Sequence, residues 1–203
     1  MVEFFVNGGS FMWPILGTLI IGLAFIGERL YHLIRALRTK FDFAVSLTSI
    51  IEKDGIEAAK TTCDGAEGPV ANLCYNALEV ANQGPEAVER KLEQTAGIEM
   101  ASLEKNMTWI SLCIATAPML GFLGTIAGMI VAFADIAAAE NISPKIVADG
   151  IGQALYTTAF GLVVAVIIQF GQNTIMFIID NLIVTIQKSM TVVTESIAKK
   201  SKK

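Results

Sequence analysis

Three long stretches of the sequence carry no charged side chain. They are residues 4–27, 106–134 and 150–179, and they contain 24, 29 and 30 residues. About 20 apolar residues, each advancing an α-helix by roughly 1.5 Å, cross a hydrocarbon core of roughly 30 Å. Each stretch is therefore long enough to form a membrane-spanning helix. A soluble bundle of buried helices is the alternative, but such a bundle seldom needs uncharged helices of this length.

The first stretch could instead be a cleaved signal peptide. Residues 1–10 contain Glu3 but no lysine or arginine, whereas a signal peptide begins with a basic region. After the stretch, the segment from Glu28 to His32 continues as helix-forming sequence rather than as a polar mature start. We therefore predict an outside N-terminus at residues 1–10, followed by a first transmembrane helix with a cytoplasmic extension at residues 11–40.

Basic residues near the ends of the stretches predict the orientation of the chain. Four of them follow the first stretch, and these are Arg29, Arg35, Arg38 and Lys40. The short segment 136–149 contains Lys145 as its single basic residue, whereas residues 181–203 contain five lysines. Basic residues near span ends are retained in the cytoplasm. The pattern predicts an outside N-terminus, a short outside loop at residues 136–149 and a cytoplasmic C-terminus.

Residues 41–105 form the one sizeable segment that mixes apolar and charged positions at helical spacing. Turn signals with glycine and proline interrupt it at residues 64–69 and 83–85. The segment is too short and too polar for a convincing enzyme domain. We predict a cytoplasmic helical region that extends the membrane bundle, followed by the second transmembrane helix at residues 106–135.

The third transmembrane helix is expected at residues 150–180, and it does not end at the membrane. Beyond Asp180, apolar residues continue at helical spacing and no glycine or proline interrupts them. The prediction is one unbroken helix from about Val147 to Ser196, with a cytoplasmic helical extension and basic tail at residues 181–203. The fold class is therefore an all-α integral membrane protein with three transmembrane helices and long cytoplasmic helical extensions.

Composition supports this class and argues against several others. Hydrophobic residues make up 53% of the chain and charged residues 17%, against roughly 25% charged in an ordinary soluble domain. The net charge of −4 and the lack of a basic stripe argue against nucleic-acid binding. Cys63, Cys74 and Cys113 form no CxxC pair and His32 is the single histidine, so we expect free thiols, no metal site and no cofactor. The absence of paired carboxylates or a nucleophile–base pair argues against an enzyme.

Small residues recur at spacings of three or four in the second and third predicted membrane helices. Such residues mark close helix packing in lipid. The candidates for packing are Pro118, Gly121, Gly124, Gly128, Ala154, Gly161 and Ala165. One chain is not expected to satisfy two small-residue faces and also enclose a partner, so we predict that these faces build a homo-oligomeric ring.

Polar residues inside the spans are informative, because each needs a partner or water. The second span offers Thr116 and Thr125, and the third offers Gln153, Tyr156, Thr157, Thr158, Gln169 and Gln172. No charged residue and no histidine lies inside a span, so this chain alone makes a poor ion carrier. Taken singly, a threonine in a span more often bonds the carbonyl one turn back than conducts ions.

Two segments resemble the sequence signatures of the ExbB/TolQ/MotA family of ion-channel motor subunits. Residues 117–133 read APMLGFLGTIAGMIVAF and resemble the family's second-helix signature, a proline followed by LGLLGTVxGxxxxF. Residues 151–166 read IGQALYTTAFGLVVAV and resemble its third-helix signature, IxEALxxTAxGLxxAI. The two motifs stand in the right order on the right spans. The chain length and the short outside loop resemble ExbB or TolQ more than a flagellar MotA.

The resemblance implies a ring of five such subunits around two single-span partners of the ExbD, TolR or MotB type. Each partner carries an aspartate in its membrane helix that accepts the ion, which supplies the carboxylate that this chain lacks. Position by position, Thr125 and Thr158 fall on the family's pore-facing threonines, and Pro118 falls on its second-helix proline. Thr157 faces about 100° away from Thr158 around the helix, so it is the weaker candidate for the ion path.

One position departs from the family pattern. Where ExbB and TolQ proteins usually carry glutamate, this chain has Gln153, which cannot ionise but can order water. The leading hypothesis is a proton-conducting subunit of a motor complex in the bacterial inner membrane, which does work on a TonB-like envelope protein as in TonB-dependent transport. A non-conducting membrane scaffold, or a motor subunit of the Tol or flagellar type, is the alternative.

Overall fold

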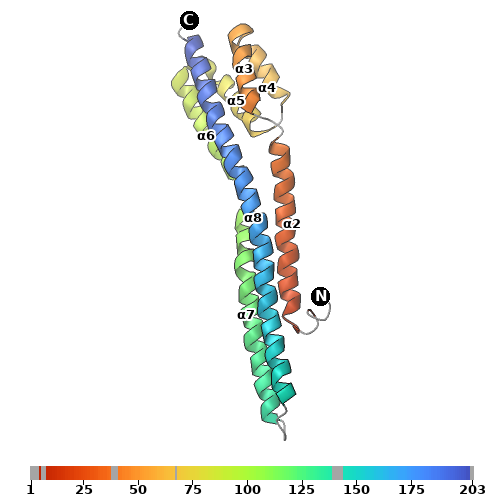
Figure 1. Cartoon of the computed structure of the whole chain (residues 1–203). Helices are drawn as coiled ribbons and strands as arrows, with labels where there is room; N and C mark the ends of the chain where they lie inside the picture. The colour runs from red at the N-terminus through yellow and green to blue at the C-terminus, as the bar shows by residue number, and fades with distance from the viewer. Residues whose placement is uncertain (1–4, 6–7, 38–40, 67, 139–143, 202–203) are drawn as a thin grey trace. The chain divides into compact units, whose positions relative to one another are not determined.

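The computed structural model of the chain describes residues 5, 8–37, 41–66, 68–138 and 144–201. Every regular element in these ranges is a helix (Figure 1). The elements are α2 (Met12–Ala36), α3 (Phe41–Lys53), α4 (Ile56–Asp64), α5 (Pro69–Glu79), the 3₁₀ helix η1 (Ala81–Gln83), α6 (Pro85–Leu103), α7 (Met107–Ala138) and α8 (Pro144–Ser201). The predicted all-helical fold is confirmed for this part of the chain.

Contacts divide the chain into two compact units. Unit 1 contains Met1–Glu28 and Asn106–Thr174, and unit 2 contains Arg29–Lys105 and Ile175–Lys203. Unit 1 therefore holds the first part of α2, all of α7 and the first part of α8, whereas helices α3 to α6 belong to unit 2.

Three helical stretches are long and apolar enough to cross a membrane. They are Met12–Ala36, Pro85–Ala138 and Ala148–Lys199, with 25, 54 and 52 residues. The second stretch contains α6 and α7, and its uncharged part lies within α7. By length and composition, the prediction of three helices able to span a membrane is confirmed.

Helix α8 is a single helix of 58 residues. It starts before Val147 and ends after Ser196, so it is longer than the sequence pattern predicts. Beyond Asp180, in unit 2, its buried side chains recur at spacings of three and four. These are Leu182, Ile186, Ser189, Val193 and Ile197, and Ser196 is buried beside the last of them. This spacing keeps one face of the helix buried along its length.

Two Gly-Pro pairs start helices in unit 2, at the turns that the sequence predicts. Gly68 has a φ of 126° and Gly84 a φ of 101°, values that residues with a side chain rarely adopt. Pro69 and Pro85 then stand in the first turn of α5 and α6, where a proline loses no helical hydrogen bond and its fixed φ suits the helix. Helix α5 packs against α3, α4 and α6 in this unit.

The connection from α6 to α7 is short and turns at Asn106. This residue has a φ of 65°, a left-handed conformation that asparagine tolerates better than most residues with a Cβ. Its Nδ2 donates a hydrogen bond of 2.9 Å to Oε2 of Glu28, which lies on α2 in the same unit. The start of α7 is thereby tied to α2 within unit 1.

The three cysteines are free and buried, as the sequence predicts. In unit 2, burial raises the pKa of Cys63 from 9.0 to about 11. Burial also raises the pKa of Cys74 from 9.0 to about 12, with a smaller contribution from repulsion by Cys63. Because the thiolate is the reactive form of cysteine, both groups are expected to be poor nucleophiles near neutral pH.

We expect Cys63 and Cys74 to react slowly with a maleimide at pH 8 in the folded chain. A rise in pKa from 9.0 to about 11 lowers the thiolate fraction at that pH about a hundredfold. The measurement is the rate of mass increase in a Cys113→Ala background. The control is Thr61→Cys, an exposed position on α4, in a chain whose native cysteines are alanine. Reaction of Cys63 at the control rate would contradict its buried placement.

Candidate functional site

In unit 1, helices α7 and α8 approach so closely that two of their glycines have no room for a side chain. A Cβ added to Gly161 would lie 2.6 Å from the carbonyl oxygen of Ala117. A Cβ added to Gly121 would lie 3.1 Å from the Cα of Thr158. The neighbouring atoms belong to backbone and cannot rotate away, so only glycine permits this approach.

The close contact between α7 and α8, which we call the seam, continues toward the start of α8. A Cβ added to Gly124 would lie 2.5 Å from the methyl carbon Cγ2 of Thr157. A Cβ added to Gly128 would lie 3.2 Å from the Cβ of Ala154. The small-residue faces of the two helices therefore satisfy each other within one chain. The part of the expectation that says one chain cannot satisfy both faces is therefore wrong, whereas the ring stays a prediction.

The remaining predicted packing residues, Ala165 and Pro118, lie further along the two helices. Ala165 is buried on α8. Pro118 is half-buried inside α7, which continues through it. Since proline has no N–H, the carbonyl of Ile114 one turn earlier loses the hydrogen bond that it would otherwise accept within the helix.

Thr125 of α7 and Thr158 of α8 meet at this seam. Their hydroxyls are hydrogen-bonded to each other, and both side chains are half-buried. Thr158 Oγ1 also lies 3.1 Å from the carbonyl oxygen of Gly121. Thr125 Oγ1 lies 3.3 Å from that same carbonyl and 3.2 Å from the carbonyl of Ala154. The pair of residues that the sequence singled out is thus brought together by the structure.

Two hydroxyls supply two protons to this set of acceptors. If Thr125 donates to Thr158, then Thr158 donates to the Gly121 carbonyl. In the reverse order, Thr158 donates to Thr125, and Thr125 donates to the carbonyl of Ala154 or Gly121. In either order one hydroxyl oxygen keeps both lone pairs free to accept a hydrogen bond. The pair can therefore accept a hydrogen bond from water or from a protonated acid. To donate a hydrogen bond to an anion, one hydroxyl must give up its hydrogen bond to a backbone carbonyl.

Thr157 has a different environment from its neighbour Thr158. Its side chain is 1% exposed, and its hydroxyl lies 2.9 Å from the carbonyl oxygen of Gln153 and 3.3 Å from that of Gly8. Its methyl group fills the space beside Gly124. The geometry gives Thr157 a packing contact inside unit 1 and does not join it to the Thr125–Thr158 pair.

Gln153 lies one turn before Thr157, at a small cavity. Its side chain is exposed, and its amide occupies the space where a Cβ on Gly9 would stand. Gly9 has a φ of 72°, which favours glycine in any case. The cavity has a volume of about 110 Å³ and is bordered also by Phe11 and Gly124. A cavity of this size has room for water, and none of the described residues that line it carries an ionisable side chain.

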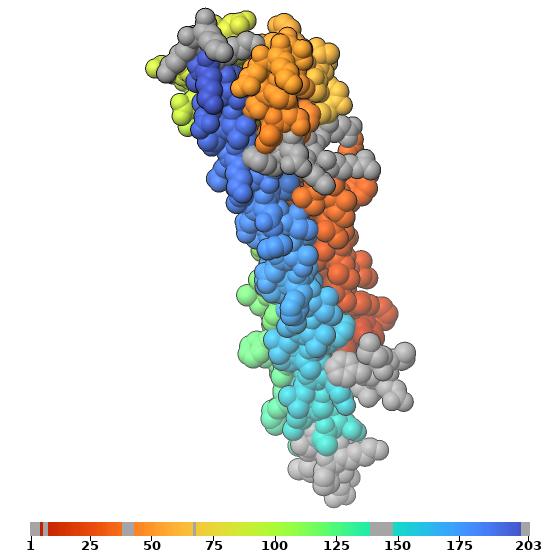
Figure 2. All heavy atoms as spheres, turned by 45° about the horizontal axis from the view of Figure 1, so that its top comes forward, coloured from red at the N-terminus to blue at the C-terminus, as the bar shows by residue number. Residues whose placement is uncertain are grey.

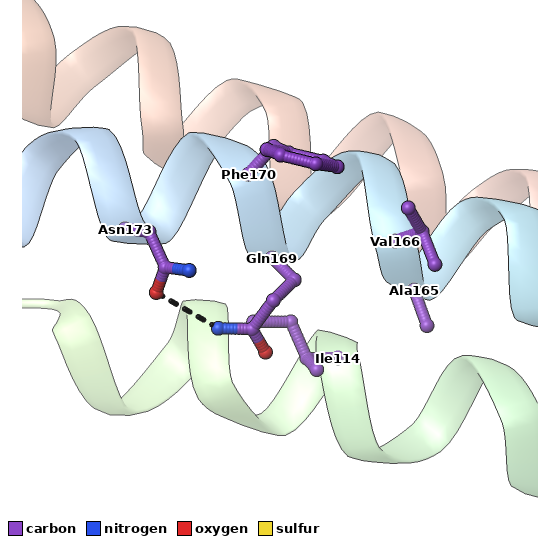
Figure 3. A pocket seen from close by; sticks show the side chains of 6 residues that line it. All are labelled: Ile114, Ala165, Val166, Gln169, Phe170 and Asn173. Carbon is purple, nitrogen blue, oxygen red and sulfur yellow. Dashed lines mark hydrogen bonds between the residues drawn. The ribbon is translucent and has the colours of Figure 1, made fainter.

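A second hollow of unit 1, of about 370 Å³, lies further along α8 (Figure 3). Its lining consists of Ile114 of α7 and of Ala165, Val166, Gln169, Phe170 and Asn173 of α8, so four of the six residues are apolar. Gln169 Nε2 donates a hydrogen bond of 3.0 Å to Asn173 Oδ1. Sequence analysis noted Gln169 as a polar residue but assigned it no site, and it passed over Asn173. The spacing of four, which puts two amides on one helix face, was the available signal.

The surface of α8 outside these sites is largely apolar. In Figure 2 the part of α8 that belongs to unit 1 lies open on the face shown, in cyan to light blue. The exposed large apolar residues of this part include Leu155, Leu162, Val163 and Ile167. Such a face suits lipid or another apolar protein surface rather than water.

Comparison with known proteins gives a family match. The model of the MotA/TolQ/ExbB proton channel family matches residues 65–188, a range that contains both threonines of the pair. It also contains the whole of α5, α6 and α7.

Several curated proteins are similar to this chain. A putative biopolymer transport protein ExbB homolog of Methanothermobacter thermautotrophicus is 29% identical over 169 residues, which cover 83% of this chain and 60% of the relative. The biopolymer transport protein exbB1 of Vibrio cholerae is 29% identical over 78% of this chain and 71% of its own length. The Tol-Pal system protein TolQ of Haemophilus influenzae is 29% identical over 51% of this chain and 50% of its own length. The chain thus spans about 60% of the length of the archaeal relative.

We expect Gly161→Ala to destabilise unit 1, because the added methyl would meet the Ala117 carbonyl at 2.6 Å. Overpacking of this kind costs about 1–3 kcal/mol. The matched control is Gly152→Ala on the same helix, where the new Cβ meets no atom within 4 Å. Removing a glycine from an open helix position stabilises it by up to about 1 kcal/mol. Thermal unfolding of the detergent-solubilised protein compares the two, and equal midpoints would refute the close approach of α7 and α8.

Proposed function

The chain belongs to the MotA/TolQ/ExbB proton channel family, and we propose that it is the ion-conducting subunit of a motor complex in the cytoplasmic membrane. The observation that supports this most directly is the hydroxyl pair of Thr125 and Thr158, held between two helices whose spans carry no charge. Ions pass along this polar patch, and the resulting motion does work on an envelope protein, as in TonB-dependent transport.

The ion-accepting carboxylate comes from a second protein in this proposal. Neither uncharged stretch of α7 or α8 contains an acidic residue, a lysine or a histidine. A single-span partner of the ExbD or TolR type supplies an aspartate inside the membrane, next to the threonine pair. A charge at the centre of a membrane helix costs about 2.5–3.5 kcal/mol on insertion scales. A hydrogen bond from one of the two hydroxyls lowers that cost while the carboxylate is ionised.

The threonine pair suits a group that alternates between two protonation states. When the carboxylic acid is protonated, the hydroxyl oxygen that keeps both lone pairs free accepts a hydrogen bond from its O–H. When it is ionised, a hydroxyl leaves the carbonyl of Gly121 or Ala154 and donates to the anion. Neither state requires a charge on this chain. Each elementary charge that crosses at 100 mV releases about 2.3 kcal/mol, which matches the usual free energy of an allosteric switch of about 1–3 kcal/mol.

We place five copies of the chain in a ring around the partner helices. The support for this comes from the family and not from the small-residue faces, which are occupied within one chain. The exposed apolar residues of α7, such as Phe122, Ile126 and Phe133, are available for contacts between subunits or with lipid. The N-terminus and the loop at residues 136–149 lie outside in this arrangement, and unit 2 lies in the cytoplasm.

A non-conducting scaffold is the second candidate function. Gln153 favours it, because the glutamate usual at this position in ExbB and TolQ is absent and the site cannot relay a proton by ionising. The scaffold and the channel differ in one measurable property, which is proton flow through the assembled complex.

We expect Thr158→Val and Thr125→Val to leave assembly intact and to lower proton flow. Valine keeps the shape of threonine but removes the hydroxyl, and a hydrogen bond to a charged group contributes about 1.5–3 kcal/mol. Flow should therefore fall roughly tenfold to a hundredfold. The measurement is the decay of a pH gradient in vesicles that hold the complex with its single-span partner.

The matched controls are Thr116→Val on α7 and Thr174→Val on α8. Each of these hydroxyls bonds the carbonyl one turn back on its own helix, Leu112 and Phe170 respectively. Both control variants should conduct as the wild type does. Wild-type flow in Thr125→Val and Thr158→Val would remove the pair from the mechanism, and a wild-type complex without proton flow would favour the scaffold.

The orientation is tested by labelling from outside the cell. Loop residues 139–143 and Glu67 lie outside the described part of the chain, so we choose the exposed positions Ala137 and Asp64. In a chain without native cysteines, Ala137→Cys should react with an impermeant maleimide in intact cells, and Asp64→Cys should react only after lysis. The reverse pattern would overturn the topology that the basic residues predict.

A further inference from the structure

The seam between α7 and α8 has two edges, and different parts of unit 1 lie along them. On α8, Gln153 precedes Thr158 by five residues, so the two side chains point about 140° apart around the helix axis. Ala154 and Gly161, which meet α7, lie between these two directions. Thr158 therefore stands on one edge of the seam and Gln153 on the other.

Helix α7 shows the same division. Thr125 bonds Thr158 on the first edge, where both side chains are half-buried. Gly124 points about 100° away from Thr125, and a Cβ added to it would lie 2.5 Å from Cγ2 of Thr157 on the second edge. We call the first edge, with Thr125 and Thr158, the threonine edge. The second edge, with Gly124, Gln153 and Thr157, is the glutamine edge.

The turn at residues 8–11, which precedes α2, lies over the glutamine edge and contacts α8. The hydroxyl of Thr157 lies 3.3 Å from the carbonyl oxygen of Gly8. The amide of Gln153 fills the space where a Cβ on Gly9 would stand. Since Gly9 leaves this space open, the side chain of Gln153 packs directly against the backbone of the turn.

The same turn also contacts α7. A Cβ added to Gly124 would lie 3.1 Å from the Cβ of Phe11. Ser10 and Phe11 line the small cavity of about 110 Å³ together with Ala127 of α7 and Gln153 of α8. The turn therefore bridges the two helices on the glutamine edge.

Further contacts hold the N-terminal segment and α2 on this edge. The ring of Phe5 lies edge to face against the rings of Trp13 on α2 and Phe160 on α8, with centroid distances of 5.2 and 5.9 Å. Further along, a Cβ added to Gly22 of α2 would lie 2.6 Å from Cδ1 of Ile168 on α8. The glutamine edge is thus covered by the chain itself.

We infer that the turn at residues 8–11 limits the movement of α7 against α8, and that Gln153 is a positioning residue for the Thr125–Thr158 pair and not a part of the ion path. Two helices that touch along one line can roll against each other. A segment that contacts both of them on one edge limits this roll. The hydroxyls on the other edge are then kept within hydrogen-bonding distance.

This inference rests on the proposed function and changes the meaning of the glutamine at position 153. The contact with Gly9 depends on the length of the side chain and not on a charge. The lack of an ionisable group at Gln153 is then compatible with conduction, and it no longer favours the scaffold.

The first test measures the turn itself and needs no ion flow. The backbone N–H of Met12 donates a hydrogen bond of 3.2 Å to the carbonyl of Gly9. In the complex with its single-span partner, this amide should exchange its hydrogen roughly tenfold faster in Gln153→Ala, because the turn loses its contact with α8. It should exchange at the wild-type rate in Gln153→Met, whose side chain has nearly the same length. Hydrogen–deuterium exchange read by mass spectrometry compares the three proteins.

The second test measures proton flow in vesicles that hold the same complex. Gln153→Ala should assemble and conduct roughly tenfold more slowly than the wild type, since the pair then bonds the partner's carboxylate less well. Gln153→Met should conduct as the wild type does. In a Thr158→Val background, Gln153→Ala should lower the flow no further, because the pair through which it acts is already lost. Two independent places on an ion path would give losses that multiply.

The outcomes separate failure of this inference from failure of the proposed function. A wild-type complex without proton flow would remove the proposed function and the positioning role with it. If the wild type conducts, unchanged exchange or unchanged flow in Gln153→Ala would overturn the positioning role alone. Slow conduction by Gln153→Met, or a loss that multiplies with Thr158→Val, would also overturn it and would place the amide on the ion path. If Gln153→Ala does not assemble, Gln153→Asn, which is one methylene shorter than the wild type, decides by the same criteria.

Discussion

The contact of two helix backbones at Gly121 and Gly161 is the constraint on which the candidate site depends. A carbonyl inside a helix is normally committed to the N–H four residues later, and side chains keep other donors away from it. Where both helices lack a Cβ, Thr158 of α8 reaches the carbonyl of Gly121 on α7, and Thr125 bonds the same carbonyl from its own helix. The hydroxyl pair is therefore a result of packing. If the two helices lay further apart by the size of a methyl group, the two hydroxyls would no longer meet. Each would then bond only a carbonyl of its own helix.

Much of the fold follows from the distribution of charge and of glycine and proline along the chain. A long run of residues without charge nearly always forms a membrane helix. A Gly-Pro pair such as Gly84-Pro85 interrupts one helix and places the proline in the first turn of the next. These are local rules, so one sequence is enough to apply them. The prediction for α8 was three residues short at its start and five short at its end. Pro144 can begin the helix, because a proline in the first turn loses no helical hydrogen bond.

The candidate site was harder to predict from the sequence, because it depends on which helix faces contact each other. The small-residue pattern indicates close packing but does not say whether the second face belongs to the same chain. Here Gly128 meets Ala154 within one molecule. Thr157 and Thr158 differ by one position, yet only the geometry shows that one fills a packing gap and the other bonds Thr125. Gln169 and Asn173 each look like a single tolerated polar residue, and their shared hollow becomes visible only when Pro118 and Ile114 are placed opposite them.

The absence of carboxylate, lysine, arginine and histidine side chains from the uncharged runs of α7 and α8 has a consequence for how the complex responds to acidity. His32 is the single histidine of the chain, and it lies outside both runs. Neither run contains an aspartate, a glutamate, a lysine or an arginine. In the proposed complex, a titration curve of ion flow near neutral pH would therefore belong to the carboxylate of the partner protein. Substitutions at the threonine pair would move its midpoint, and a missing curve would point to a change in the partner rather than in this chain.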